Sequence, residues 1–288
     1  MSRAIYATPK TVTELSQCAF YHTMQIPGYG LVDGQWDLRE GAERYLGHVD
    51  FAGKRVLELG KASGFLTFHM EGQGAEVIAY DLSEHDDWDV VPMARLRRSQ
   101  EEISPLYPRG VRTWRDFQRL RREGIAQLNN GFWLAHRAFG SRARLVTGAV
   151  YDVPTAIGAV DVAVFGSILL HLRDPFLALQ RSARLTRETI VVADLVPDSV
   201  RHVDAPSGGE RETEGGSLGT YAKFIPDPAA GGPLDIWWQI SPELVLRWLA
   251  ILGFEDGKVS HHVQPFQGHP VPLYTVVAQR TVEMDPTE

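Results

Sequence analysis

Arg55-Val56-Leu57-Glu58-Leu59-Gly60-Lys61-Ala62-Ser63-Gly64-Phe65-Leu66 is the stretch that decides the fold of this 288-residue chain. Its apolar, β-branched beginning predicts a buried strand, its glycines predict a tight turn, and the apolar spacing that starts at Phe65 predicts a helix. Glycine in such a turn lets the backbone lie against a ligand, and the first N–H groups of the helix remain free to bind it. We therefore expect a strand–turn–helix unit that binds a small molecule.

A second predicted strand, Glu76 to Tyr80, ends at Asp81, which follows Gly60 by 21 residues. This is the spacing at which a carboxylate at the tip of the second strand meets ribose hydroxyls. The natural ligand is then a nucleoside-containing cofactor. An ordinary strand–turn–helix without a ligand is the alternative.

Two glycine patterns compete for the turn. The dinucleotide pattern G-x-G-x-x-G would place a bulky Phe65 where a third glycine permits close helix–strand packing. The other pattern, acid-x-Gly-x-Gly-x-Gly, is met with one Gly-to-Ala change by Glu58, Gly60, Ala62 and Gly64. It resembles the first motif of the class I S-adenosylmethionine (SAM) methyltransferases, and the resemblance implies that Asp81 binds the ribose of SAM.

Later segments complete the predicted sheet. Strands are expected at Arg144–Val146, Ala159–Phe165 and Thr189–Ala193, followed by a hairpin of Val259–Phe266 and Leu273–Gln279. The expected fold class is α/β, with a Rossmann-like seven-stranded, mostly parallel sheet whose last strand is antiparallel, a helical insertion and an N-terminal lid.

The same pattern sets the expected organisation of the chain. Residues 1–50 form an N-terminal arm or lid, residues 51–280 the SAM-binding methyltransferase domain, and residues 281–288 a tail. Within the domain we expect a helical insertion at 85–140 and a substrate loop at 197–236. Helices are predicted after Phe65 and from Pro175 to Leu185. Further helices are predicted from a helical pattern at Thr11–Leu15, at Asp37–Leu46, Met93–Ser99 and Thr113–Gly140, and after a cap at Ser241.

Composition narrows the class of protein. The net charge of −7 and the pI of about 5.8 argue against a general nucleic-acid binder. The single Cys18 excludes an internal disulfide and a cysteine zinc cluster. No apolar run approaches the ~20 residues that span a bilayer, and no early signal sequence is present, so we expect a cytoplasmic protein without membrane contact. The oligomeric state stays open.

Charge is spread unevenly along the chain. Residues 95–144 hold 12 arginines and no lysine against four acidic residues, whereas the rest of the chain is strongly acidic. Such a segment suits an anionic partner, or it pairs with carboxylates of the body. Pairing is the commoner arrangement.

A narrower resemblance rests on Tyr21-His22-Thr23, Trp36-Asp37-Leu38-Arg39 and Leu169-Leu170-His171-Leu172-Arg173-Asp174-Pro175. These motifs are similar to the group around the bacterial tRNA wobble-uridine carboxymethyltransferase. In that group a tyrosine that helps to hold the carboxylate of carboxy-SAM stands where this chain has Leu170. The departure implies ordinary SAM and a different acceptor.

We therefore expect SAM-dependent methyl transfer to an oxygen or nitrogen of a small-molecule acceptor, such as a natural product or a sugar. A tRNA wobble-uridine (carboxy)methyltransferase is the first alternative, and a non-catalytic SAM-binding scaffold is the second.

Site residues follow from the motif, the predicted strand ends and the resemblance. The expected cofactor-binding residues are Glu58, Gly60, Ala62, Gly64, Asp81, Leu82, Tyr151, Asp152, Val153, Phe165 and Ser167. Aromatic residues expected to meet the acceptor are Tyr29, Trp36, Tyr221, Trp237 and Trp238.

Histidine supplies the candidate bases, because its pKa suits proton transfer near neutral pH. His171, after the predicted fourth strand, is the first candidate and His22 the second; a hydrogen-bonded structural role is the alternative for both. His261 and His262 are expected at solvent-exposed positions, and as neighbours in a strand they point to opposite faces. No metal site is expected.

Overall fold

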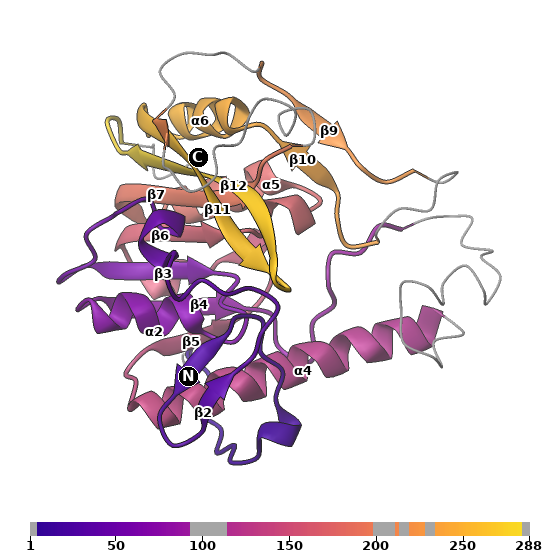
Figure 1. Cartoon of the computed structure of the whole chain (residues 1–288). Coiled ribbons are helices and arrows are strands. Elements are labelled where there is room, and N and C mark those ends of the chain that lie inside the picture. Colours follow the sequence, from indigo (N-terminus) through magenta and orange to yellow (C-terminus); the bar gives the residue numbers. More distant parts are fainter. Residues whose placement is uncertain (1–4, 93–113, 198–210, 213–218, 228–233, 284–288) are drawn as a thin grey trace.

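One twisted sheet dominates the computed structural model, which describes residues 5–92, 114–197, 211–212, 219–227 and 234–283 (Figure 1). Its strand order is β5-β4-β3-β6-β7-β12-β11-β8. The bounds are β3 (Arg55–Leu59), β4 (Glu76–Asp81), β5 (Arg144–Thr147), β6 (Val160–Gly166), β7 (Thr186–Leu195), β8 (Arg211–Glu212), β11 (Asp256–Phe266) and β12 (His269–Gln279).

Strand directions confirm the predicted fold class. β3, β4, β5, β6 and β7 run parallel, whereas β12 pairs antiparallel with both β7 and β11. The predicted seven strands are thus present, and the two-residue β8 adds a short pairing at the β11 edge. Since parallel strands end together, the carboxyl ends of β3, β4, β6 and β7 meet at one edge.

Successive side chains of each strand point to opposite faces of this sheet, and both faces are packed. Leu57 and Leu59 belong to the apolar cluster that also holds residues of α5 (Pro175–Ala183) and α6 (Pro242–Ile251). Val56 belongs to the opposite cluster, which holds residues of α1 (Ala42–Tyr45) and α2 (Phe65–Gly72). Near-continuous apolar strands are what a sheet covered on both faces requires.

Local capping explains where the later helices begin. Asp174 accepts a hydrogen bond from the Leu177 N–H (2.9 Å) at the start of α5, and Ser241 accepts one from the Leu244 N–H (3.3 Å) at the start of α6. Each cap is followed by a proline at the first helical position, where its missing N–H costs nothing. The Ser241 cap was predicted correctly.

The N-terminal arm contains less helix than predicted. Only the 3₁₀ turn η1 (Leu15–Gln17) follows the predicted Thr11–Leu15 segment, and α1 spans one turn of the predicted Asp37–Leu46 helix. Gly41 caps α1 without a side chain, and Gly47 then takes a left-handed φ of 63°, so the helix stops. Between these elements β1 (Met24–Ile26) and β2 (Gly30–Val32) form a hairpin.

Most described residues of the helical insertion belong to α4 (Trp114–Phe139), which lies close to the bounds predicted for this helix. The predicted helix Met93–Ser99 lies outside the described residues. In Figure 1, α4 runs along the β5 side of the molecule and extends beyond the sheet. Within the described ranges, no helix is both long enough and apolar enough to cross a membrane.

Short segments join the sheet to these layers. The 3₁₀ turns are η2 (Val150–Asp152), η3 (Thr155–Ile157) and η4 (Leu169–His171). A small hairpin of β9 (Ala222–Phe224) and β10 (Trp238–Ile240) lies within the predicted substrate loop and its continuation. The Trp237 N–H donates to the Leu170 carbonyl (2.8 Å), so this hairpin is fixed to the chain that follows β6.

We predict that Gly64→Ala lowers the free energy of unfolding by about 2–4 kcal/mol. Gly64 has a φ of 92°, and a Cβ there would lie 2.7 Å from the rings of Phe132 and Phe68. Gly72→Ala is the matched control, because a Cβ at this last residue of α2 meets nothing within 4 Å. Urea denaturation should show the control unchanged or stabilised by up to about 1 kcal/mol. Equal effects would contradict this account of the turn.

Candidate active site

Three residues of the glycine turn hold left-handed backbone conformations: Gly60 at φ 81°, Ala62 at 48° and Gly64 at 92°. The Gly60 N–H donates to the Tyr80 carbonyl (2.9 Å), which ties the turn to the end of β4. A Cβ at Gly60 would lie 2.3 Å from Ile168, the residue that leads out of β6. Gly60 therefore has to be glycine, and the turn touches the neighbouring strand end.

Asp81 fastens this turn from the end of β4. Its Oδ2 accepts the Ala62 N–H (2.9 Å), and its Oδ1 accepts the Leu82 N–H (2.8 Å). The side chain keeps 25% of its surface exposed. Because each carboxylate oxygen can accept two hydrogen bonds, Asp81 can hold the turn and still receive hydroxyl groups of a ligand. The residue predicted to bind ribose thus has the geometry for it.

Lys61 connects the same carboxylate to α4, and the sequence reasoning assigned it no role in the site. Its side chain is 1% exposed, and Nζ donates to Asn129 Oδ1 (2.6 Å) and lies 3.7 Å from Asp81 Oδ2. The Asn129 amide in turn donates to the Leu82 carbonyl (3.1 Å). In the sequence, only the presence of a lysine within the glycine turn could have indicated this role, because its partner Asn129 on α4 is distant in sequence.

Glu58 faces α2 rather than the ligand edge. It is 2% exposed, and its carboxylate accepts a short hydrogen bond from the Thr67 hydroxyl. Burial raises the pKa of Glu58 to about 7. Glu58 was predicted to bind the cofactor, and its position fits support of the turn and of the first helical residues.

Three of the predicted cofactor-binding residues follow β5: Tyr151 and Asp152 lie in η2, and Val153 caps it. The Tyr80 hydroxyl donates to the Ala149 carbonyl (3.0 Å) and holds this segment against β4. Asp152 is exposed, Val153 is buried in the core, and the Tyr151 hydroxyl donates to Asp89. Of the three, Asp152 offers a polar side chain for a ligand.

Phe165, near the end of β6, and Ser167, just after it, lie in different surroundings. Phe165 is fully buried in the core, so it supports the edge without lining it. Ser167 holds a left-handed φ of 52°, its N–H donates to the Ala193 carbonyl (2.8 Å), and its hydroxyl lies 2.8 Å from the Tyr45 hydroxyl. Such strain in a non-glycine residue is typical of functional sites.

The two candidate histidines lie in different surroundings. His171 Nδ1 donates to the Asp235 carbonyl, which leaves Nε2 as the nitrogen able to accept a proton; burial lowers the pKa of His171. His22 packs against Tyr21 and Phe65, and its Nδ1 has no hydrogen-bond partner in the described structure. Burial lowers the pKa of His22 to about 3, so this ring is neutral at physiological pH.

Of the predicted acceptor-binding aromatics, two lie close to the chain after β6. Trp237 donates from Nε1 to the Asp89 carbonyl (2.6 Å), and Trp238 donates from Nε1 to the Arg173 carbonyl (3.3 Å). The Tyr221 N–H bonds Ser241 at the far end of the β9–β10 hairpin.

The other two aromatics belong to the N-terminal arm. Trp36 packs on Phe266 and donates to the Tyr21 hydroxyl (3.2 Å). Tyr29 is separate: its hydroxyl donates to the Thr13 carbonyl (3.2 Å), and its ring packs with the cluster beneath α4. Tyr29 is not brought together with the other predicted site residues.

His262 corrects a further prediction. It is 6% exposed, and its Nε2 lies 2.9 Å from the Thr275 hydroxyl. The prediction of a solvent-facing ring was wrong because α1 covers this face of β11, with the Tyr45 ring 5.9 Å from the imidazole.

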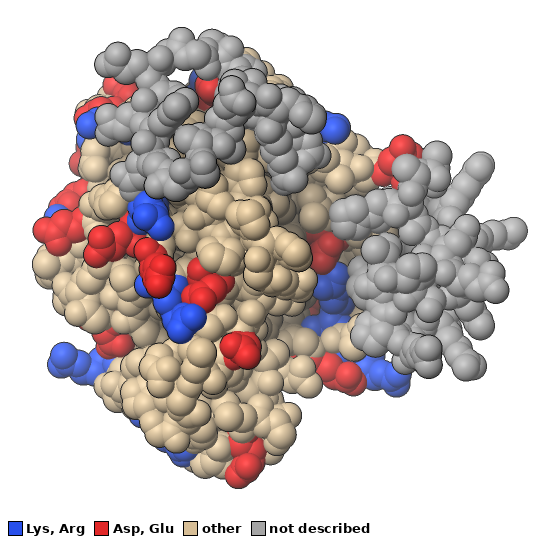
Figure 2. Space-filling model, in the orientation of Figure 1, with Lys and Arg blue, Asp and Glu red and all other residues tan. Residues whose placement is uncertain are grey.

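Carboxylates of the body pair with part of the arginine-rich insertion. Arg121 lies 2.6 Å from Asp235, and Arg122 lies 2.9 Å from Asp87. On the face shown in Figure 2, basic and acidic side chains are interspersed rather than separated into large patches. For these two arginines the structure bears out pairing with the body.

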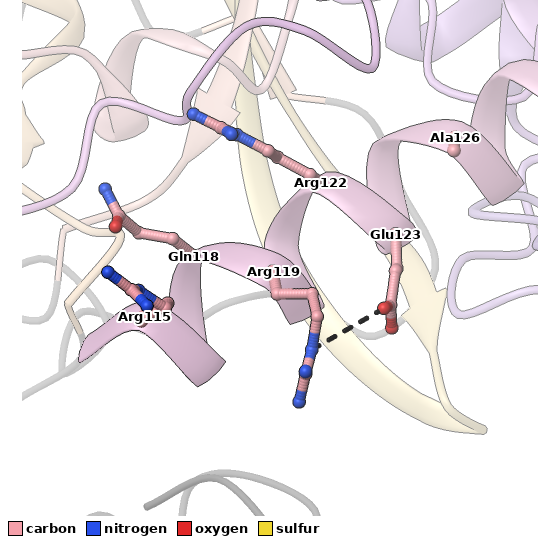
Figure 3. Close-up of a pocket in the computed structure, with 6 residues that line it drawn as sticks. All are labelled: Arg115, Gln118, Arg119, Arg122, Glu123 and Ala126. Carbon is pink, nitrogen blue, oxygen red and sulfur yellow. Dashed lines mark ion pairs between the residues drawn. The ribbon is translucent and has the colours of Figure 1, made fainter. Parts of the chain in front are cut away.

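An open hollow of about 480 Å³ lies on α4 (Figure 3). It is lined by Arg115, Gln118, Arg119, Arg122, Glu123 and Ala126. Arg119 pairs with Glu123 along the helix (3.8 Å), whereas Arg122 points to the other side. Every lining residue comes from α4, so this hollow is distinct from the sheet edge that carries the glycine turn.

Comparison with known proteins places the fold. No protein-family model and no curated protein sequence matches the chain. Among solved structures, the N-terminal domain of EvdMO1 in the presence of SAH and D-fucose aligns over 92% of this chain and 93% of that chain, with a TM-score of 0.51 and 16% identity. The same domain with SAH bound gives a TM-score of 0.52 and 15% identity over the same shares. At this identity the likeness establishes a shared fold.

We predict that Asn129→Leu lowers the free energy of unfolding by about 2–4 kcal/mol, because it leaves the buried Lys61 ammonium without its nearest acceptor. Asn130→Leu is the matched control: Asn130 makes an exposed bond to the Gln17 carbonyl, and its loss should cost at most about 1 kcal/mol. Chemical denaturation of both variants measures the difference. Similar values would show that Lys61 does not depend on Asn129.

Proposed function

We propose that this chain is a SAM-dependent methyltransferase that acts on an oxygen or nitrogen of a small-molecule acceptor. The observation that carries the proposal is the Asp81 carboxylate, which fixes the glycine turn through Ala62 and keeps acceptor capacity for two ribose hydroxyls. The two groups that the SAM motif requires therefore meet at the edge where open parallel sheets bind ligands.

The proposed cofactor position follows the strand ends. The left-handed turn at Gly60, Ala62 and Gly64 lets the backbone approach SAM, and the exposed Asp152 lies beyond β5, where the adenine is expected. When bound, SAM supplies an activated methyl group. The chain's own residues then hold the acceptor in line with that methyl group and receive the acceptor's proton.

Likeness to EvdMO1 supports the cofactor and the size of the acceptor. Its N-terminal domain, which shares this fold over nearly the whole chain, was crystallised with SAH and in the presence of D-fucose. A monosaccharide is accordingly one of the first acceptors to test.

Leu170 favours ordinary SAM over carboxy-SAM. Its side chain is 6% exposed and apolar, so it offers no hydrogen bond to an additional carboxylate. This chain therefore lacks the tyrosine that, in the tRNA wobble-uridine carboxymethyltransferase group, helps to hold the carboxylate of carboxy-SAM.

His171 remains the candidate base among the histidines, since its Nδ1–H is held by Asp235 and its Nε2 is the basic atom. His22, with a pKa lowered to about 3, is a much weaker base. Neither histidine is required for the cofactor proposal.

The scaffold alternative loses its main support. It rested on the unusual Lys61 and Ala62 in the glycine turn. Lys61 has a structural partner in Asn129, and the Ala62 N–H donates to Asp81. Both residues therefore fit a turn built to bind a cofactor.

We predict that Asp81→Asn weakens SAM binding at least about tenfold, because hydrogen bonds to a charged group contribute roughly 1.5–3 kcal/mol each. Asp161→Asn is the matched control: its carboxylate accepts the Arg55 N–H (2.8 Å) at the opposite end of the parallel strands. Isothermal titration calorimetry of both variants with SAM measures the effect. Undiminished binding by Asp81→Asn would remove the cofactor assignment.

We retain tRNA as a second candidate acceptor because three arginines line the hollow on α4. If the protein bound tRNA through 6–10 phosphate contacts, its affinity would fall by a factor of about 10³–10⁵ between 50 and 200 mM salt. We expect no such salt-dependent binding, because Arg119 and Arg122 are already paired with carboxylates. A fluorescence titration with bulk tRNA at the two salt concentrations measures this affinity. If binding depended steeply on salt and Arg115→Glu abolished it, the result would favour a tRNA-modifying enzyme.

A further inference from the structure

Asp194 ends β7 with a buried carboxylate that is only half satisfied. Its side chain is 3% exposed, and Oδ1 accepts the Leu195 N–H (2.7 Å). Oδ2 has no hydrogen-bond partner in the described structure. Since a buried polar atom without a partner costs free energy, such an atom calls for a functional explanation.

Two tyrosines, Tyr21 and Tyr45, pack with the cluster that holds Ala193, the residue before Asp194. Burial raises the pKa of both tyrosines, and the charge of Asp194 makes a smaller contribution in the same direction. Tyr45 OH lies 2.8 Å from Ser167 Oγ, and Tyr21 OH accepts from Trp36 Nε1 (3.2 Å). Tyr21 is partly exposed, so the group borders solvent on the side of the N-terminal arm.

The group lies beside the glycine turn. β3, β6 and β7 are adjacent strands, and the Ser167 N–H bonds the carbonyl of Ala193, the residue before Asp194. Ile168, next to Ser167, fills the space that a side chain at Gly60 would need. A methyl donor on the turn would thus face the end of β7 across a single strand.

We propose that Asp194 Oδ2 binds the hydroxyl or amine that becomes methylated and receives its proton. This inference rests on the proposed methyltransferase function. In the step, the acceptor's oxygen or nitrogen forms a bond to the methyl carbon, the carbon–sulfur bond breaks with its electron pair going to sulfur, and the acceptor's proton passes to Oδ2. SAM becomes SAH.

The proposal specifies the acceptor class. A neutral hydroxyl or an amine can donate to Oδ2, whereas a carboxylate or phosphate at that position would be repelled by Asp194 and by Asp235, whose charge also reaches Tyr21. We therefore expect phenols, sugar hydroxyls or amines, and no anionic nucleophile.

Acid–base properties agree with this geometry. Burial raises the pKa of Asp194 to about 7, whereas burial lowers the pKa of His171. Asp194 is therefore the stronger base of the two near neutral pH. The groups that sense its charge are phenols of Tyr21, Tyr45 and Tyr274, whose raised pKa values keep them protonated there.

The decisive variant is Asp194→Asn, which keeps the shape and the Oδ1 hydrogen bond but removes the base. A panel of phenols, primary amines and monosaccharides including D-fucose is incubated with SAM, and SAH formation is measured. For any compound that the wild-type chain methylates, we expect kcat to fall about 10²–10⁴-fold with the Kd for SAM within about twofold. Asp161→Asn is the matched control and should retain activity. Full turnover by Asp194→Asn, or loss in His171→Asn alone, would overturn the assignment.

Thermal unfolding gives a second readout that needs no acceptor. The folded pKa of Asp194 lies above its unfolded value of about 3.9. Between about pH 4 and pH 7 the carboxyl group therefore ionises more readily in the unfolded chain than in the folded one, and the wild-type protein loses stability as the pH rises. Asp194→Asn should therefore gain Tm relative to wild type as the pH rises through this range. Parallel Tm profiles would overturn the inference. Absence of SAM binding by the wild-type chain would instead contradict the proposed function, so the two failures are distinct.

Discussion

The hydrogen bond from the Ala62 N–H to Asp81 is the contact on which the candidate site depends. It forces the turn after β3 against the end of β4, and the left-handed conformation of Ala62 makes it geometrically accessible. The same carboxylate lies 3.7 Å from the buried Lys61 ammonium, which Asn129 of α4 also holds. One acidic residue thereby connects two strands and a helix, and a buried cation stays tolerable because a carboxylate is near it.

Around this contact the edge of the sheet divides into two chemical regions. Over β3, β4 and β5 it offers backbone N–H groups, the partly exposed carboxylate of Asp81 and the exposed carboxylate of Asp152, which suit a sugar and a base. Over β6 and β7 it offers Ser167, its neighbour Tyr45 and the unsatisfied Asp194, which suit a hydroxyl or an amine. The two regions meet at Ile168, so donor and acceptor groups would lie side by side.

Periodic apolar patterns and glycine spacing predicted the sheet and the turn because both are encoded by neighbouring residues. The strand ends, Asp81 and the Ser241 cap follow from such local signals. The contact of Lys61 does not, because its partner Asn129 is distant in sequence. His262 was misplaced for the same reason, since only the folded arm shows which face of β11 α1 covers.

The short arm helices were over-predicted because helical spacing says nothing about the contacts that the arm makes with the sheet. The Asp37 N–H bonds the Pro265 carbonyl at the end of β11 (3.0 Å), and the chain around it follows the sheet instead of coiling. Tertiary hydrogen bonds of this kind override weak helix propensity.

A crystal structure of the chain with SAH tests the central claim most directly. The account predicts the ribose hydroxyls on the Asp81 carboxylate, the adenine beside η2 and the sulfur facing the ends of β6 and β7. Density for SAH at the hollow on α4, or at any place that leaves Asp81 without a ligand contact, would contradict it.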